Sequence, residues 1–184
     1  MKKRAFFLDR DGTVNVEVDY LHRPEDAVLI PGAAAAIRRL HEAGYLAVVV
    51  TNQAGVAKGL YPESDIAPVH AKLRELLAAE GDAPDAFYYC PHHPKFTGVC
   101  GCRKPAPGML LRAARDLDID LGRSVMVGDR MSDVEAGRRA GCAKSYLVRT
   151  GYGEEVLRTA DVTGVPVAAD LAAAVEDWLE AERR

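Results

Sequence analysis

The sequence predicts an α/β fold with three layers, in which helices cover both faces of a Rossmann-like parallel sheet. Short apolar runs, rich in β-branched or aromatic residues, alternate along the chain with longer stretches of helical periodicity. Strands and helices that alternate in this way form right-handed βαβ units, and these units build a parallel sheet. Polar residues follow several of the apolar runs, and in such sheets ligands bind at the carboxyl ends of the strands.

Each apolar run is a predicted strand. Because the runs are apolar at nearly every position rather than at alternate ones, we expect both faces of the sheet to be buried. The predicted strands cover residues 5–8, 46–50, 86–89, 124–127 and 145–148. One polar or reactive residue lies within two residues of the end of each of four strands, so we expect these side chains to gather at one edge of the sheet. They are Asp9, Thr51, Cys90 and Asp129.

Residues with known capping preferences mark the ends of the predicted helices. Gly44 closes the first helix and Pro107 opens the third. Ser132 and Glu135 form a predicted capping box for the fourth helix, and Gly141 ends it. The predicted helices cover residues 31–43, 64–80, 107–117, 136–140 and 171–182.

The composition is typical of an ordinary globular protein. The 184 residues, 48% of them hydrophobic and 28% charged, are expected to form a single domain over residues 1–184. The net charge of −3 argues against a nucleic-acid binder that neutralises phosphates with clustered Lys and Arg. The segments 11–51 and 51–104 leave no room for a separate cap domain beyond the elements already assigned.

The apolar run 5–8 is too short for an export signal, and no window approaches the ~20 apolar residues of a membrane span. We therefore expect a cytoplasmic protein with no membrane partner, whose four cysteines stay reduced. Cys142 lies far from the other three along the chain and is expected to be a buried apolar residue.

Two carboxylates, Asp9 and Asp11, stand two residues apart where the first strand gives way to a turn at Gly12. In this arrangement both can face the same side, where they repel each other unless a divalent cation lies between them. Hard oxygen ligands of this kind suit Mg²⁺. An isolated pair would more often be a solvated turn, but the buried strand before it and Thr13 after Gly12 favour the metal site.

Residues suited to binding a phosphoryl group follow the second strand and precede the third helix. Thr51, Asn52 and Gln53 offer a hydroxyl and backbone amides that bind a phosphoryl oxygen, although such a segment also caps turns. Arg103 and Lys104 supply a guanidinium fork and a point charge, which suit phosphate and transition-state charge.

Two further acids, Asp129 and Asp133, follow the fourth strand, although Asp133 alone is equally consistent with a charge at a helix start. Four segments, 9–13, 51–53, 103–105 and 128–133, thus carry polar residues suited to this chemistry. In this order they resemble the motifs of the haloacid dehalogenase superfamily of phosphotransferases. The resemblance implies that Asp9 is the nucleophile and Asp11 the general acid and then base, with Thr51 and Lys104 as phosphoryl stabilisers. It also implies a Mg²⁺ site formed by Asp9, Asp129 and the backbone carbonyl of Asp11, and it leaves the role of Asp133 open.

A second metal site is predicted in the loop 90–102. Three thiolates and one imidazole form a complete tetrahedral zinc site with no open position, and a closed site of this kind is structural. Its predicted ligands are Cys90, His92, Cys100 and Cys102. His93 is a weaker alternative ligand, and a chance group of reduced thiols is the other interpretation. Zinc at this place would stiffen the loop and aim Arg103 at a substrate.

With this loop the sequence resembles the D-glycero-D-manno-heptose 1,7-bisphosphate 7-phosphatases and the related histidinol-phosphatases. The resemblance covers nearly the whole chain and includes residues 17–20, 51–59 and 107–110. It implies hydrolysis of the 7-phosphate through an aspartyl-phosphate intermediate in nucleotide-activated heptose biosynthesis, with a small phosphorylated sugar as the substrate. Because the chain is small and has no cap domain, we expect a monomer. The implied substrate contacts are Glu17, Val18, Asp19, Tyr20, Asn52, Gln53, Ala54, Arg103 and Arg130.

Two departures from the heptose enzymes leave specificity open. The loop between His92 and Cys100 is shorter than in many of them, and Arg130 stands where Lys often follows the metal-binding Asp. The preferred anomer is therefore not decided, and histidinol phosphate stays an alternative substrate. A phospho-accepting signalling domain is a further alternative, but an acceptor on the first strand with Asp two residues later argues against it. A zinc-based nucleic-acid module would need a basic face and an aromatic platform that the sequence lacks.

Overall fold

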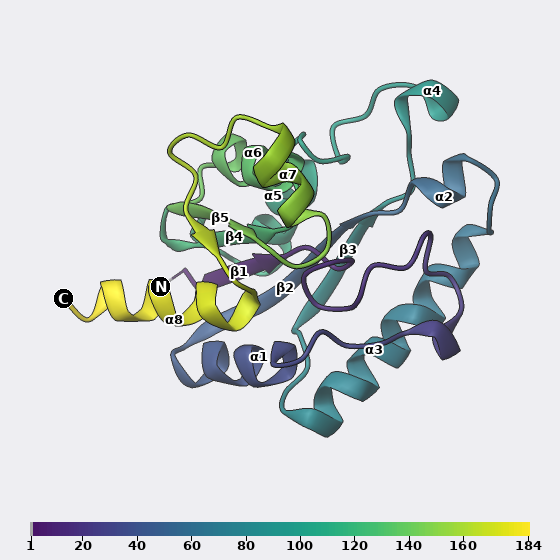
Figure 1. Ribbon diagram of the computed structural model, residues 1–184. Coiled ribbons are helices and arrows are strands. Elements are labelled where there is room, and N and C mark those ends of the chain that lie inside the picture. Colours follow the sequence, from purple (N-terminus) through teal and green to yellow (C-terminus); the bar gives the residue numbers. More distant parts are fainter. Residues whose placement is uncertain (1) are drawn as a thin grey trace.

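The computed structural model describes residues 2–184, and in these residues six strands form one parallel sheet (Figure 1). The strand order is β3-β2-β1-β4-β5-β6, which confirms the predicted Rossmann-like sheet. The strands are β1 (Arg4–Leu8), β2 (Tyr45–Asn52), β3 (Ala86–Cys90), β4 (Val125–Gly128), β5 (Lys144–Val148) and β6 (Val167–Ala168). β6 was not predicted, because two residues are too few to show a periodicity.

Helices cover both faces of the sheet, as predicted (Figure 1). Phe6 and Leu8 of β1 point into a core cluster that α1 and α8 complete, whereas Ala5 and Phe7 point into a second cluster beneath α5 and α6. Because side chains on both faces of the sheet are buried, the central residues of the strands are apolar on both faces. The helices are α1 (Ala33–Glu42), α2 (Ala54–Ala57), α3 (Ile66–Glu80), α4 (Pro94–Thr97), α5 (Gly108–Asp116), α6 (Met131–Ala140), α7 (Gly153–Thr159) and α8 (Leu171–Glu182).

The predicted start of the fourth helix is wrong. α6 begins at Met131, and the carboxylate of Asp133 accepts a hydrogen bond of 3.0 Å from the backbone N–H of Arg130. Ser132 lies inside the first turn and cannot cap it, because β4 ends at Gly128 and the helix follows almost at once. Cys142 packs against the second core cluster but is only partly buried.

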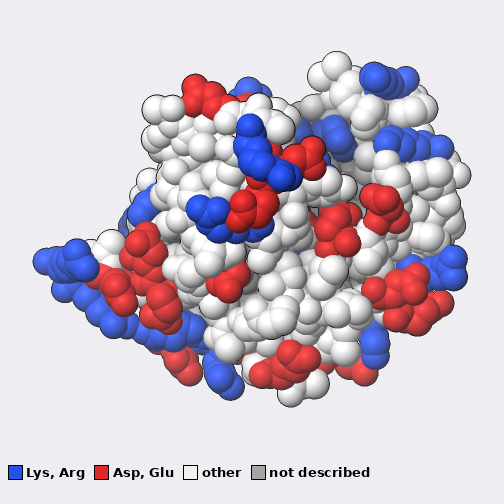
Figure 2. All heavy atoms as spheres, viewed as in Figure 1, with Lys and Arg blue, Asp and Glu red and all other residues white. Residues whose placement is uncertain are grey.

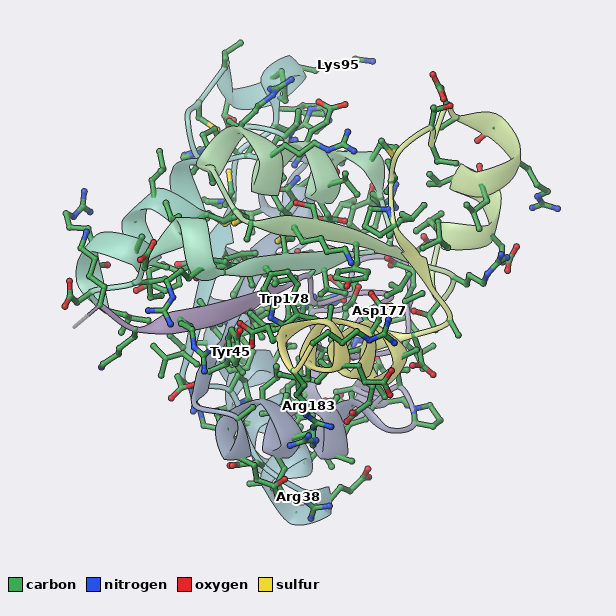
Figure 3. All side chains as sticks on the ribbon, turned by 90° about the vertical axis from the view of Figure 1, so that its left-hand side faces the viewer. Arg38, Tyr45, Lys95, Asp177, Trp178 and Arg183 are labelled. Carbon is green, nitrogen blue, oxygen red and sulfur yellow. The ribbon has the colours of Figure 1, made fainter. Side chains whose placement is uncertain are left out.

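Charged side chains of both signs are interspersed on the face shown in Figure 2. The last helix, α8, is held against the start of β2, where the indole N–H of Trp178 donates to the Tyr45 hydroxyl over 2.8 Å (Figure 3). None of the helices in residues 2–184 combines the length and apolar character that a membrane crossing requires.

The direction in which the sheet grows reverses between β1 and β4, which pair in parallel at its centre. At such a switch point the connections leave the two strands on opposite sides, and a crevice opens at their carboxyl ends. Asp9 follows β1 and Asp129 follows β4, so both stand at this crevice. Thr51 and Cys90 were expected just after their strands and instead lie within the last residues of β2 and β3, at the same edge.

Candidate active site

A cleft of about 490 Å³ opens at the carboxyl edge of the sheet. Most of the predicted site residues line it: Asp9, Asp11, Glu17, Asp19, Tyr20, Thr51, Asn52, Gln53, Ala54, Arg103, Lys104 and Arg130. Val18 does not, because its side chain packs against the apolar cluster of Leu21, Val69 and Leu73. Asp129 is fully buried beneath the floor of the cleft.

The floor carries a cluster of three buried carboxylates. One oxygen each of Asp9, Asp129 and Asp133 lies within 4.8 Å of the others. Burial, and then the negative charge of Asp133, raises the pKa of Asp9, and burial and the charge of Asp9 raise the pKa of Asp129. Oδ2 of Asp129 accepts a hydrogen bond of 2.8 Å from the N–H of Tyr152, but its Oδ1 is buried without a partner.

This arrangement fits a divalent cation, since an unpartnered carboxylate oxygen beside two other acids is a set of hard ligands with excess negative charge. The sequence left the role of Asp133 open, and the structure places this residue in the cluster. The Asp11 carboxylate, which the sequence placed beside the cation, is not part of it and has other partners.

Lys104 is the cation that the structure itself supplies to this cluster. Its ammonium is buried and donates to Asp9 Oδ1 and to the Val50 carbonyl, each over 2.7 Å, and it pairs with Asp133 Oδ1 at 2.6 Å. Although burial opposes it, the charges of Asp133 and Asp9 raise the pKa of Lys104, so the amine stays protonated. The Asn52 side chain donates to the Lys104 carbonyl and accepts from its N–H, both at 3.0 Å. Asn52 therefore holds Lys104 in place.

The Asp11 carboxylate is bound by three side chains. Asn15 Nδ2 donates to Oδ1 over 3.0 Å, and Arg10 donates to the same oxygen through Nε and Nη2 over 3.2 and 3.0 Å. Gln53 Nε2 donates to Oδ2 over 3.2 Å and to the Thr51 hydroxyl over 2.7 Å. Thr51 and Asp11 are therefore linked through one amide group.

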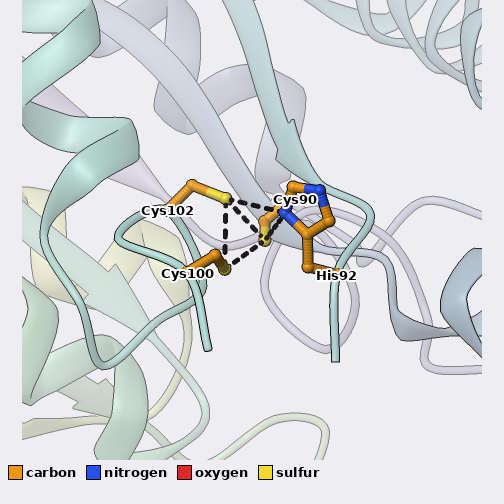
Figure 4. Close-up of side chains that lie close together, drawn as sticks. All are labelled: Cys90, His92, Cys100 and Cys102. Carbon is orange, nitrogen blue, oxygen red and sulfur yellow. Dashed lines mark hydrogen bonds between the residues drawn. The ribbon is translucent and has the colours of Figure 1, made fainter. Parts of the chain in front are cut away.

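Cys90, His92, Cys100 and Cys102 point toward a common centre, as Figure 4 shows. Cys100 Sγ lies 3.6 Å from Cys90 Sγ and 3.4 Å from Cys102 Sγ, and His92 Nδ1 lies 3.7 Å from Cys90 Sγ and 3.4 Å from Cys102 Sγ. Tetrahedral zinc with bonds of about 2.3 Å sets its sulfur ligands about 3.8 Å apart. The Cys90–Cys102 separation of 2.8 Å is shorter, yet too long for a disulfide. The donor set fits zinc.

His93, the alternative ligand, lies outside this group, because its ring accepts a hydrogen bond from the Lys95 N–H at the start of α4. Arg103 Nη1 donates to the His92 carbonyl over 3.2 Å. The Cys/His cluster is thus tied directly to the arginine that lines the cleft.

Comparison with known proteins identifies the family. Residues 101–174 match the HAD-hydrolase-like family model. The D-glycero-D-manno-heptose-1,7-bisphosphate 7-phosphatase of Thermosynechococcus vestitus is 46% identical, over 97% of this chain and 96% of its own length. The D-glycero-beta-D-manno-heptose-1,7-bisphosphate 7-phosphatase of Bordetella bronchiseptica is 40% identical, over 96% of this chain and 98% of its own. The chain belongs to the heptose-bisphosphate phosphatase family.

Solved structures of this family have the same fold. The D,D-heptose 1,7-bisphosphate phosphatase of B. bronchiseptica, crystallised with magnesium and phosphate, matches with a TM-score of 0.88 and 39% identity over 97% of this chain and 99% of that one. The corresponding structure from Burkholderia thailandensis matches with a TM-score of 0.72 and 33% identity, over 96% of this chain and 99% of that one. The chain is therefore a phosphatase, a hydrolase of phosphoric monoesters.

The rim of the cleft in this phosphatase carries charges of both signs. Burial, and then the charge of Asp11, raises the pKa of Glu17 to about 7. The Arg130 guanidinium lies over the Tyr152 ring, 3.7 Å from its centroid, and the Lys58 ammonium contacts the Tyr20 hydroxyl.

Several residues that line the cleft were not predicted as part of it. They are Lys58, Tyr61, Pro105 and Tyr152, together with His93 and Ser132, for which the sequence predicted an alternative zinc ligand and a helix cap instead. Ligands bind at the carboxyl ends of parallel strands, and Tyr152 follows the carboxyl end of β5. The same argument that predicted Asp129 could therefore have predicted Tyr152. Lys58 and Tyr61 follow α2, a short helix that the sequence did not predict, so this rule did not reach them, although Lys58 lies in the segment 51–59 that resembles the heptose enzymes.

Proposed function

We propose that the protein hydrolyses the 7-phosphate of D-glycero-D-manno-heptose 1,7-bisphosphate through an aspartyl-phosphate intermediate, as a step of nucleotide-activated heptose biosynthesis. The observation that carries this proposal is the buried pair of Asp9 and Lys104, 2.7 Å apart, beside Asp129 at the switch point of the sheet. The substrate is inferred from relatives that are 40% and 46% identical and bear the name of this reaction.

Asp9 is the proposed nucleophile. One of its carboxylate oxygens attacks the phosphorus, and the bond between phosphorus and the sugar oxygen breaks. Asp11 gives a proton to the sugar oxygen as it leaves. In the second step Asp11 takes a proton from water, whose oxygen attacks the phosphorus, so that inorganic phosphate leaves and the Asp9 carboxylate is restored.

Lys104 and Thr51 are the proposed phosphoryl stabilisers. The ammonium of Lys104 is fixed by three acceptors before the substrate arrives, so it has no reorganisation cost in the transition state. Magnesium, held by Asp9, Asp129 and the backbone carbonyl of Asp11, would neutralise charge on the phosphoryl oxygens. Asp133 orients Lys104 and adds negative charge to the cation site.

Zinc is the proposed occupant of the Cys/His cluster, where it has a structural role. It would fix the loop whose His92 carbonyl accepts from Arg103, and so would keep this arginine on the rim of the cleft. The proposed contact of Arg103 is the second phosphate of the bisphosphate, for which a guanidinium fork is suited. Glu17, Asp19, Tyr20 and Arg130 are further proposed contacts on the rim.

Histidinol phosphate is the second candidate substrate. Glu17 and Asp19 on the rim favour it, because they suit a cationic amine better than a second phosphate. We also propose that the enzyme works as a monomer in the cytoplasm.

The test is phosphate release from both anomers of the heptose bisphosphate and from histidinol phosphate, with Mg²⁺ present. We expect the two bisphosphates to be preferred over histidinol phosphate, and Asp9→Asn to abolish release. Asp161→Asn, on an exposed loop outside the cleft, is the matched control and should keep the wild-type rate. A preference for histidinol phosphate would refute the substrate, and an active Asp9→Asn variant would refute the nucleophile.

A further inference from the structure

Arg10, which stands between Asp9 and Asp11 in the sequence, is a fully buried cation. Its side chain is 1% exposed, and its guanidinium donates to the Asp11 carboxylate on one side. On the other side Nη2 donates to the Leu21 carbonyl and to Gln53 Oε1, each over 3.3 Å, and Nη1 lies 3.3 Å from His70 Nε2. A buried guanidinium needs acceptors for its N–H groups, and here they come from three separate segments.

The contact with Arg10 determines the state of His70. Arginine only donates hydrogen bonds, so Nε2 of His70 must accept, and the ring is the neutral tautomer with its proton on Nδ1. Burial, and then the charge of Arg10, lowers the pKa of His70 to about 3, so the ring is neutral near pH ~7. His70 is 8% exposed, and its ring stacks on Phe87 with centroids 4.5 Å apart. It is therefore a fixed acceptor.

Arg10 also determines the orientation of the Gln53 amide. Because Arg10 Nη2 donates, the atom of Gln53 that faces it must be the oxygen, which also accepts from the Tyr61 hydroxyl over 2.7 Å. The nitrogen of the same amide is thereby aimed at Asp11 Oδ2 and at the Thr51 hydroxyl. The Arg10 guanidinium thus donates to Oδ1 of Asp11 itself, and it orients the Gln53 amide that donates to Oδ2.

We infer that His70 is a positioning residue for Asp11 and acts through Arg10: its ring nitrogen holds the guanidinium that orients the Asp11 carboxylate both directly and through Gln53. The inference rests on the proposed role of Asp11 as the proton donor and acceptor. His70 does not line the cleft, and it contacts Arg10 at Nη1, whereas the Asp11 carboxylate accepts from Nε and Nη2. Its loss should therefore affect turnover more than substrate binding.

The test compares two substitutions in the full chain, His70→Gln and His70→Met, whose side chains are of similar length. Glutamine has an oxygen that replaces the acceptor, and methionine does not. For His70→Met we expect kcat to fall by ~10- to 100-fold, as a misplacement of about 1 Å of a reacting group does, while KM changes less than about threefold. His70→Gln should recover most of kcat. His41→Gln, on α1 outside the cleft, is the histidine control and should keep the wild-type kcat.

Two results would overturn the inference. Wild-type kcat in His70→Met would show that Arg10 needs no acceptor there, and equal losses in His70→Met and His70→Gln would show that the ring serves only in packing. If His70→Met fails to fold, His70→Phe keeps the stacking on Phe87 without the acceptor and answers the same question. Asp11→Asn is assayed alongside: full activity in that variant refutes the proposed role of Asp11, whereas its inactivity beside an active His70→Met refutes the positioning role alone.

Discussion

Substitution of Gly12 by alanine should displace the buried carboxylate of Asp129. Gly12 has φ of +84°, and a Cβ built on it would lie 2.2 Å from Asp129 Oδ2, 2.8 Å from Asp129 Cγ and 3.0 Å from Gly151 Cα. The backbone of Gly151 cannot yield easily, so the Asp129 side chain has to move. The motif therefore needs glycine at this position both for the left-handed turn and for the close approach of Asp129.

The size of the effect has two parts. The left-handed conformation costs alanine ~1 to 2 kcal/mol of stability. The clash requires the Asp129 oxygen to retreat from 2.2 Å to at least the 3.4 Å of an ordinary contact, a shift of about 1 Å. A shift of that size breaks the 2.8 Å hydrogen bond from the Tyr152 N–H and disturbs the three-carboxylate cluster. A misplacement of about 1 Å costs ~10²-fold in rate, so we expect kcat to fall by that factor or more.

The matched control is Gly141→Ala. Gly141 has nearly the same φ, +87°, but nothing lies within 4 Å of its built Cβ, and it stands at the end of α6. In thermal unfolding both variants should lose the similar amount of stability that the left-handed conformation costs alanine. Only Gly12→Ala should also lose phosphate release at saturating Mg²⁺. If Gly12→Ala keeps the kcat of Gly141→Ala, then the position of Asp129 does not control the reaction and the reasoning fails.

Lys104→Met should lower the kcat of phosphate release by ~10³-fold or more, because it removes the fixed charge beside Asp9. A loss of kcat below about tenfold would contradict this role of Lys104. Cys100→Ser should reduce zinc retention by ~10-fold or more in metal analysis, and undiminished zinc would refute the ligand assignment. Although partial burial opposes it, hydrogen bonds with Asp82 and Asp85 raise the pKa of His41. The stabilisation from charged His41 is therefore complete below pH ~6.5 and lost as pH rises through the raised pKa. In denaturant titrations His41→Gln should cost ~1 kcal/mol or less at pH ~5.5 and almost nothing at pH ~9; an equal cost at both would contradict this.

The sequence predicted the frame of the site well, because that frame depends on local patterns. Apolar runs located five of the six strands, and the rule that ligands bind at the carboxyl ends brought Asp9 and Asp129 to one crevice before any contact was known. The Cys/His cluster was equally accessible, because its four donors lie within thirteen residues and their types are specific for zinc.

The support around Asp11 could not be predicted in the same way. Arg10 stands between two acids in the sequence, where a charged residue is normally taken as solvated, yet it is fully buried. Its acceptor His70 lies sixty residues away on α3 and carries no motif. The predicted capping box at Ser132 failed for a related reason, since the helix start depends on where β4 ends, and the residue pattern of the helix does not contain that information.

The contacts also explain how two acids can stand two residues apart without sharing one cation. Asp9 belongs to a cluster of three carboxylates, which one ammonium and one divalent cation would together bring to neutrality. The Asp11 carboxylate is not part of that cluster, and the Arg10 guanidinium balances its charge. The two members of the motif thus have different counterions, which is the condition for giving two carboxylates different roles in proton transfer and nucleophilic attack.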